Sequence, residues 1–396
     1  MIATSGRALL ITKETTLLRF APRAMRTPIS FVRRAAEYAV MPWHRRRRGV
    51  SPRSPKSSVM REMRRSPLKL AATRYSNDLN WLGTILLMFA YKEQRTMHLQ
   101  IEKLSKRYPN GTQALDEVSL SVPQGMFGLL GPNGAGKSTL MRTLATLQEA
   151  DSGSARLDDI DVLRQKDEVR KHLGYLPQEF GLYPKVSAET LLSHFAQLKG
   201  IENAKERSDV VHALLRQTNL WEHRNKSLGS YSGGMKQRFG IAQALLGNPR
   251  LIIVDEPTAG LDPEERVRFH NLLSAIGENV IVILSTHIVS DVSDLCRQMA
   301  IIHQGRVRAA GDPTELVTRL NGRMWRKAIV GSEVAGYQQR FKVISMHLFG
   351  GRNVLHVLQD DLPEPGFEPV VPDLEDLYFA TIKGFTSPTS ASGAAN

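Results

Sequence analysis

A glycine-rich segment, GPNGAGKST (131–139), has the residue types that bind phosphate, and it lies between a short apolar run and a helix-like run. Glycines let the backbone turn so that N–H groups point inward, and a helix start adds the positive end of its dipole. We expect Lys137 to bridge the β- and γ-phosphates and Ser138 to hold Mg²⁺. The expected nucleotide-binding residues here are Gly131, Pro132, Asn133, Gly134, Ala135, Gly136, Lys137, Ser138 and Thr139.

Two adjacent carboxylates follow the apolar run of LIIVDEP (251–257). The run predicts a buried strand that ends at Asp255, and ligands bind at the carboxyl ends of strands in α/β sheets. Asp255 is therefore a candidate Mg²⁺ ligand, and Glu256 is a candidate for orienting or deprotonating an attacking water. Alone, the pair could equally face solvent or cap the next helix. Together with the glycine-rich segment it predicts a P-loop ATPase.

A third segment, YSGGMKQR (231–238), lies just before the predicted Asp255 strand. Ser232 and the backbone of Gly233 and Gly234 begin a predicted helix, which forms an anion site without a lysine of its own. This segment resembles the signature sequence of the ATP-binding cassette (ABC) family. The resemblance covers about residues 97–320. It implies that two copies of the chain enclose each ATP, the loop at 131–139 from one copy and the signature from the other.

The same resemblance implies roles for four isolated residues, which appear along the chain in the order typical of the family. Gln178, in GYLPQE, resembles the glutamine that senses Mg²⁺ and water. Asp262, in GLDP, resembles the residue that contacts the opposite subunit. His287, which ends NVIVILSTH, resembles the switch histidine at the γ-phosphate, and Tyr108, in KRYPNG, lies where the family stacks an aromatic ring on adenine.

Three segments narrow the resemblance to subunits of bacterial ABC-2 exporters: GPNGAGKSTLM, GYLPQEFGLYP and PDLEDLYFATI (372–382). It implies a homodimer that binds ATP and Mg²⁺ and acts on a separate membrane-spanning permease, at the cytoplasmic face of the inner membrane. No run of about 18 apolar residues occurs in the sequence, so no segment is expected to span a bilayer. The alternative is a soluble ABC ATPase that acts on ribosomes or nucleic acid. Such proteins usually carry two cassettes or a long coiled-coil insertion, and the sequence indicates neither.

The sequence patterns of the segments around these residues predict an α/β fold. Val- and Ile-rich strands at 126–131, 250–257 and 279–287, separated by helices, indicate a mainly parallel sheet covered on both faces. The alternating segments at 97–108 and 115–122 predict an antiparallel β subdomain. A helix is expected at 137–148, and a helical subdomain at about 179–235, with Leu191, Leu192, Phe195 and Leu198 on its apolar face.

The expected domain boundaries follow from composition. The cassette is predicted at 97–320, a small appendage at 321–385 with strands near 341–349 and 353–359, and a disordered tail at 386–396. The first 96 residues hold 20 of the 53 Lys and Arg but 5 of the 39 Asp and Glu, which leaves a net charge of −1 for the rest. We therefore expect no nucleic-acid partner for the cassette, although the overall net charge is +14.

The basic leader, residues 1–96, combines arginine runs with Ser-Pro pairs and lacks periodicity, which is typical of disorder. A misplaced start before Met97 is one interpretation. A mitochondrial-like transit peptide and a basic tail that binds RNA or lipid are the alternatives. The single cysteine, Cys296, excludes an internal disulfide and is expected to be a small buried side chain.

Overall fold

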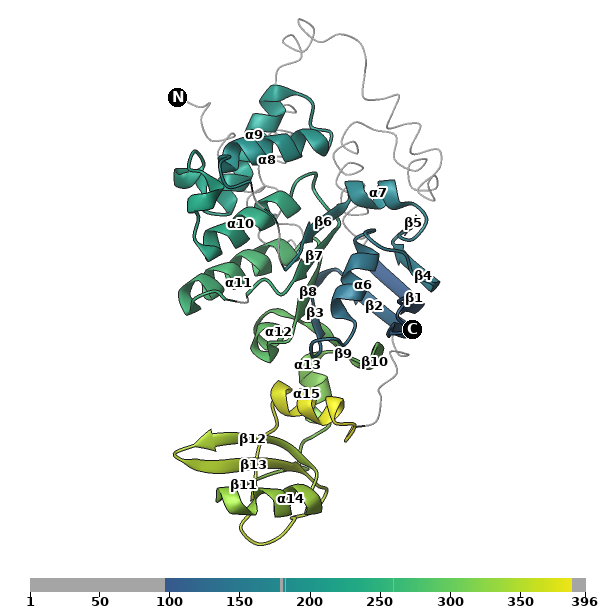
Figure 1. Cartoon of the computed structure of the whole chain (residues 1–396), viewed down its shortest axis with the longest axis vertical. Coiled ribbons are helices and arrows are strands. Elements are labelled where there is room, and N and C mark those ends of the chain that lie inside the picture. Colours follow the sequence, from purple (N-terminus) through teal and green to yellow (C-terminus); the bar gives the residue numbers. More distant parts are fainter. Residues whose placement is uncertain (1–96, 179–180, 182, 259, 387–396) are drawn as a thin grey trace, which may run out of the picture. The chain divides into compact units, whose positions relative to one another are not determined.

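The computed structural model describes residues 97–178, 181, 183–258 and 260–386 (Figure 1). Its central sheet has the order β10-β9-β3-β8-β7-β6, with parallel pairing throughout except between β9 and β10. Every residue of β7 and β8 is buried, as the Val- and Ile-rich runs predicted. The strands are β3 (Gly125–Leu130), β6 (Leu173–Leu176), β7 (Leu251–Asp255), β8 (Ile281–Thr286), β9 (Gln298–His303) and β10 (Arg306–Gly311).

Helices cover both faces of this sheet, which confirms the predicted class. Figure 1 shows α10 and α11 on one side of β6, β7 and β8 and α6 on the other. The expected helix from Lys137 ends at Leu144 and not at 148, because Thr146 has a left-handed backbone (φ 61°) that cannot continue a helix. The helices are α6 (Lys137–Leu144), α7 (Lys166–Lys171), α10 (Gly233–Ala244), α11 (Pro263–Gly277) and α12 (Val289–Leu295).

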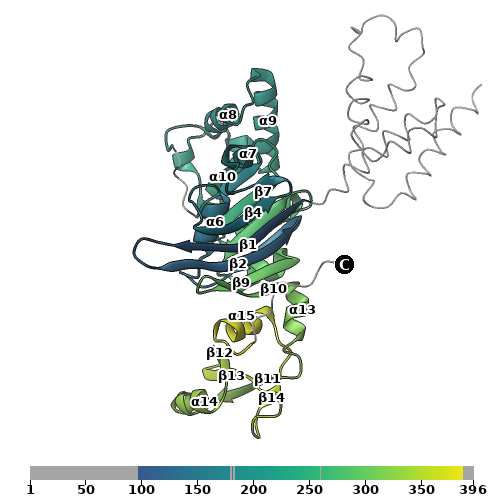
Figure 2. The same ribbon diagram turned by 90° about the vertical axis from the view of Figure 1, so that its right-hand side faces the viewer.

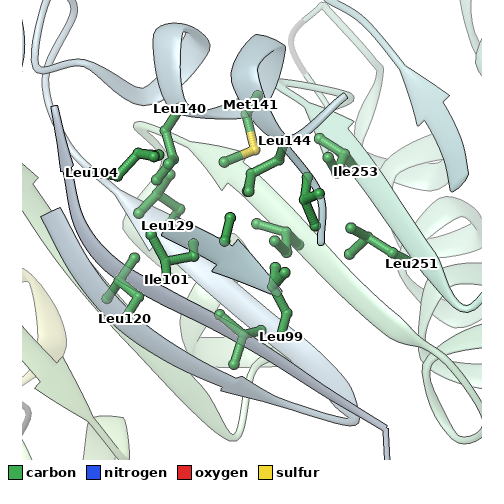
Figure 3. Close-up of a cluster of buried hydrophobic side chains, with 14 of the residues drawn as sticks. Leu99, Ile101, Leu104, Leu120, Leu129, Leu140, Met141, Leu144, Leu251 and Ile253 are labelled. Atoms are coloured by element: carbon green, nitrogen blue, oxygen red, sulfur yellow. The ribbon is translucent and has the colours of Figure 1, made fainter. Parts of the chain in front are cut away.

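An antiparallel sheet of order β2-β1-β4-β5 packs against α6 through the cluster drawn in Figure 3. Leu99, Ile101 and Leu104 are all fully buried, although strict alternation would place Leu104 on the opposite face from Ile101. The register shifts between these two residues, where Lys103 has a positive φ of 47°, so a bulge returns Leu104 to the buried face. The strands are β1 (His98–Arg107), β2 (Gln113–Pro123), β4 (Ser152–Leu157) and β5 (Ile160–Asp161).

The predicted helical subdomain contains α8 (Ala188–Leu198) and α9 (Ala204–Gln217), which begin at the side-chain caps Ser187 and Asn203. Two short turns, η3 (Trp221–His223) and η4 (Leu228–Ser230), lead to α10. Leu191 and Leu192 are buried, as their spacing predicted. The same prediction is wrong for Leu198, which is 70% exposed because the buried face of α8 ends at Ala196.

The C-terminal region contains the two predicted strands, within a sheet of order β12-β13-β11-β14 (Figure 2). Its own small core surrounds Tyr337 and Phe367. Leu374, Leu377 and Tyr378 of the last helix join the hydrophobic cluster of α11, α12 and β9, so this region and the cassette share a core. The elements are α13 (Pro313–Thr318), β11 (Met324–Ile329), η5 (Gly331–Glu333), α14 (Val334–Arg340), β12 (Val343–Phe349), β13 (Arg352–Leu358), β14 (Glu368–Pro369) and α15 (Leu374–Ile382).

Predictions for the basic leader and for the tail from residue 387 onward lie outside the described residues. Within the described ranges, no helix combines the length and the apolar character that crossing a membrane requires. Cys296 is buried at the end of α12, as expected, and burial raises the pKa of its thiol to about 12.

Candidate nucleotide-binding site

The glycine-rich segment lies between β3 and α6, in the strand–loop–helix order that the sequence predicted. Gly136 has a φ of 107°, and a Cβ on it would lie 2.4 Å from the Ala114 carbonyl oxygen. Only glycine fits this position without strain. The turn between β9 and β10 supports the loop, since the N–H of Gly305 donates to the Ala135 carbonyl at 2.9 Å. The backbone at Ala114 and the β9–β10 turn thus both lie against the loop.

Lys137 is the first residue of α6, and its side chain is only 5% exposed. Its ammonium donates to the carbonyl oxygens of Gly131 at 2.7 Å and Pro132 at 3.2 Å. Burial lowers the pKa of Lys137, and the carboxylates of Glu256 and Asp255 oppose that effect. These hydrogen bonds fold the lysine over its own loop, where phosphate oxygens can replace the carbonyls as its partners.

The Glu256 carboxylate is the point at which three separate motifs meet. Its Oε1 lies 3.6 Å from Lys137 Nζ and 3.1 Å from His287 Nδ1, and its Oε2 accepts from Gln178 Nε2 at 3.3 Å. The residue has a left-handed backbone (φ 48°), which is strained for a glutamate. A hydrogen bond from its N–H to the Ser285 carbonyl oxygen at 2.8 Å holds that conformation. We call these four residues, Glu256, Lys137, His287 and Gln178, the Glu256 cluster.

Asp255 ends β7 and is 5% exposed. Its Oδ1 lacks a hydrogen-bond partner among the described residues, as does the hydroxyl of the fully buried Ser285 on the neighbouring strand. Buried polar atoms without partners are rare in folded proteins. Asp255, the exposed Ser138 hydroxyl and the Gln178 amide are oxygen donors of the kind that a hydrated Mg²⁺ prefers.

Tyr108 lies beside the start of α6. Its hydroxyl is 3.2 Å from the Thr139 hydroxyl and 3.2 Å from Gln148 Oε1, and the residue is half-buried. The structure thus places the tyrosine next to the loop that the sequence assigned to the same nucleotide. Its stacking on adenine stays a prediction.

The signature residues and Asp262 do not join the Glu256 cluster by any hydrogen bond or ion pair in the described part of the chain. Ser232 caps α10 by accepting from the Met235 N–H at 3.2 Å, and both Ser232 and Gly233 are exposed. Asp262 caps α11 by accepting from the Glu265 N–H at 2.8 Å, and it is exposed as well. These helix starts are open to an external partner.

Two residues that sequence reasoning missed join these helix starts. Arg238 of α10 donates to Glu265 of α11, whose carboxylate also accepts from Arg268 Nη1 at 3.0 Å. A Cβ on Gly234 would lie 2.3 Å from Glu265 Oε2, so the Glu265 side chain lies close against the α10 backbone where the two helices meet. Arg238 directly precedes the apolar run FGIAQALL, and this charged residue beside a buried run was the available signal.

Comparison with known proteins identifies the family to which this site belongs. Residues 115–259 match the ABC transporter family model. The linearmycin resistance ATP-binding protein LnrL of Bacillus subtilis is 34% identical over 249 residues, which cover 62% of this chain and 78% of LnrL. The chain belongs to the ABC transporter family. As an ABC ATPase it binds and hydrolyses ATP.

Other relatives of this ABC ATPase are also transporter proteins. The daunorubicin/doxorubicin resistance ATP-binding protein DrrA of Streptomyces peucetius is 36% identical over 235 residues, which cover 59% of this chain and 71% of DrrA. The chain spans only 26% of the length of ABC transporter A family member 3 of Arabidopsis thaliana. The cassette MJ0796, in a dimeric structure bound to ADP and Pi, is 25% identical with a TM-score of 0.50, over 54% of this chain and 98% of that one. These relatives give no support to the ribosome-associated alternative.

Proposed function

We propose that this ABC ATPase powers export through a membrane-spanning permease on a separate chain, acting as a homodimer at the cytoplasmic face of the membrane. The convergence of Lys137, Gln178 and His287 on Glu256 carries the proposal, because it is an arrangement for aligning water and a γ-phosphate. The names of LnrL and DrrA, a linearmycin resistance and a daunorubicin/doxorubicin resistance ATP-binding protein, support export of a drug.

In this proposal the residues of the Glu256 cluster have different tasks. Glu256 accepts a proton from the attacking water, while His287 and Gln178 hold its two carboxylate oxygens in place. Lys137 leaves its loop carbonyls to bind the β- and γ-phosphates. Asp255, Ser138 and Gln178 would hold Mg²⁺, which would offset the negative charge of the phosphates.

The exposed starts of α10 and α11 support the homodimer. Ser232 and Gly233 present backbone N–H groups at a helix start, which is a ready anion site, yet they do not contact the Glu256 cluster of their own chain. In the dimer, this helix start binds the γ-phosphate of the ATP held by the other copy, and Asp262 faces that copy. The dimeric state of MJ0796 supports the same arrangement. Loss of the γ-phosphate after hydrolysis then separates the two copies.

Replacement of Glu256 by Gln tests the assigned base. We expect ATP binding to persist, kcat to fall by about 100-fold or more, and a dimer to accumulate with ATP on a sizing column. Glu278→Gln, at the far end of α11, is the matched control and should hydrolyse ATP normally. Normal turnover by the Glu256 variant, or a monomer in its ATP complex, would contradict the proposal.

The permease is tested by purifying the tagged chain from detergent-solubilised membranes, in parallel with ribosome co-sedimentation. Recovery of a membrane-spanning protein in stoichiometric amount supports a role in transport. Recovery with ribosomes alone, at the salt concentration of the cell, rejects it.

A further inference from the structure

A fully buried carboxylate, Asp291, lies on α12 outside the Glu256 cluster. Its two oxygens accept hydrogen bonds from four side chains, which come from three other parts of the cassette. Burying a charge is costly, and its partners must offset that cost. A well-packed apolar side chain fills such a space at little or no loss of stability, so stability alone does not require a carboxylate here.

One oxygen of Asp291 holds the two strand ends that carry Glu256 and His287. Its Oδ2 accepts from the Thr258 hydroxyl at 2.6 Å and from the Thr286 hydroxyl at 3.3 Å. Thr258 lies two residues after Glu256, and Thr286 directly precedes His287. Both threonines are buried, so these hydrogen bonds do not compete with water.

The other oxygen holds the helix that begins at Asp262. The Oδ1 atom accepts from Arg266 at 2.7 Å (Nη2) and 2.9 Å (Nε), and it lies 2.9 Å from His270 Nε2. Both donors are on α11. The Arg266 N–H donates to the Asp262 carbonyl oxygen at 2.9 Å, so the arginine lies one turn from the exposed start of the helix.

We propose that Asp291 is a positioning residue. It fixes the positions of Glu256 and His287 relative to the start of α11. One carboxylate oxygen is bound to each part, so a shift of α11 at the subunit contact moves the strand ends that carry the base and the histidine. Closure of the dimer and alignment of the water are thereby coupled within each copy. The subunit contact in this inference rests on the proposed homodimer.

Asp291→Asn tests the coupling because it keeps the size of the side chain but turns an N–H donor toward groups that are themselves donors. We expect kcat for ATP to fall by about 100-fold, the cost of a misplacement of about 1 Å at a reacting group. The affinity for Mg²⁺-free ATP should stay that of the wild-type chain, since no hydrogen bond or ion pair among the described residues joins Asp291 to the loop at 131–139. Ser293→Ala, at an exposed position on the same helix, is the control and should match wild type.

A milder variant decides the question if the Asp291→Asn protein misfolds. Thr258→Val removes one hydroxyl and keeps the shape, and we expect kcat to fall by about five- to tenfold, the equivalent of one hydrogen bond. Unchanged kcat in both variants overturns the inference. A parallel fall of kcat, ATP affinity and thermal midpoint also overturns it, because that result describes a purely structural anchor. A wild-type chain that hydrolyses ATP without dimerising would reject the proposed homodimer instead, and the variants' kcat values would still decide the positioning role.

Discussion

Glu265 is the residue whose removal should most disturb the contact between α10 and α11. The side chains of Arg238 and Glu265 are 10% and 16% exposed, and no other carboxylate is paired with Arg238 in the described residues. Glu265→Ala therefore leaves a buried cation unpaired, which costs about 3–5 kcal/mol of the free energy of unfolding. Arg238→Met should cost less, about 2 kcal/mol, because Glu265 keeps Arg268, whose side chain is half exposed.

The double variant decides whether these costs come from the pair. With both charges gone, the loss should be smaller than the sum of the two single losses by about 1–3 kcal/mol. Urea unfolding followed by circular dichroism measures the three variants, with Glu264→Gln as a control because Glu264 is 76% exposed. Strict additivity, or a Glu265→Ala protein as stable as wild type, would show that the contact does not join the two helices.

Two further predictions concern the loop and the C-terminal sheet. Gly136→Ala should abolish ATP binding, because a Cβ there meets the Ala114 carbonyl oxygen at 2.4 Å, whereas Gly336→Ala, with open space around it, should bind ATP normally in calorimetry. A hydrogen bond from Lys327 holds the pKa of Glu364 at about 2, below its usual 4.5. The stability from this carboxylate is therefore present above about pH 4.5 and is lost as the pH falls toward 2. The gap in thermal midpoint between wild type and Glu364→Gln should shrink over that range, and a gap that widens in acid would contradict this.

Much of the local structure was predictable because it depends on neighbours in sequence. The strand–loop–helix order around Lys137, the buried β7 and the helical subdomain all follow from apolar spacing and glycine placement. Three local features were not predictable from the sequence. The bulge at Lys103 and the left-handed Thr146 both depend on a single positive φ, which apolar spacing does not reveal. The exposure of Leu198 depends on where its packing partners end.

The candidate site was predictable as a set of residues but not as a geometry. Gln178 and Glu256 are 78 positions apart, and only the sheet brings their side chains within 3.3 Å. The sequence likewise contains Arg238 and Glu265 without any sign that they meet. The strained backbone of Glu256 was also unpredictable, because glutamate seldom adopts a positive φ and a contact from the neighbouring strand holds it there.

The sequence by itself determined which groups can do chemistry, since a glycine-rich loop, a lysine and two carboxylates carry their properties wherever they lie. Their order along the chain also determined the family resemblance. Only the tertiary structure decided which groups face one another and which are shielded from water. Asp291 shows the difference. In the sequence it is one acid among 39, and its role arises from full burial between elements whose contacts form across long stretches of chain.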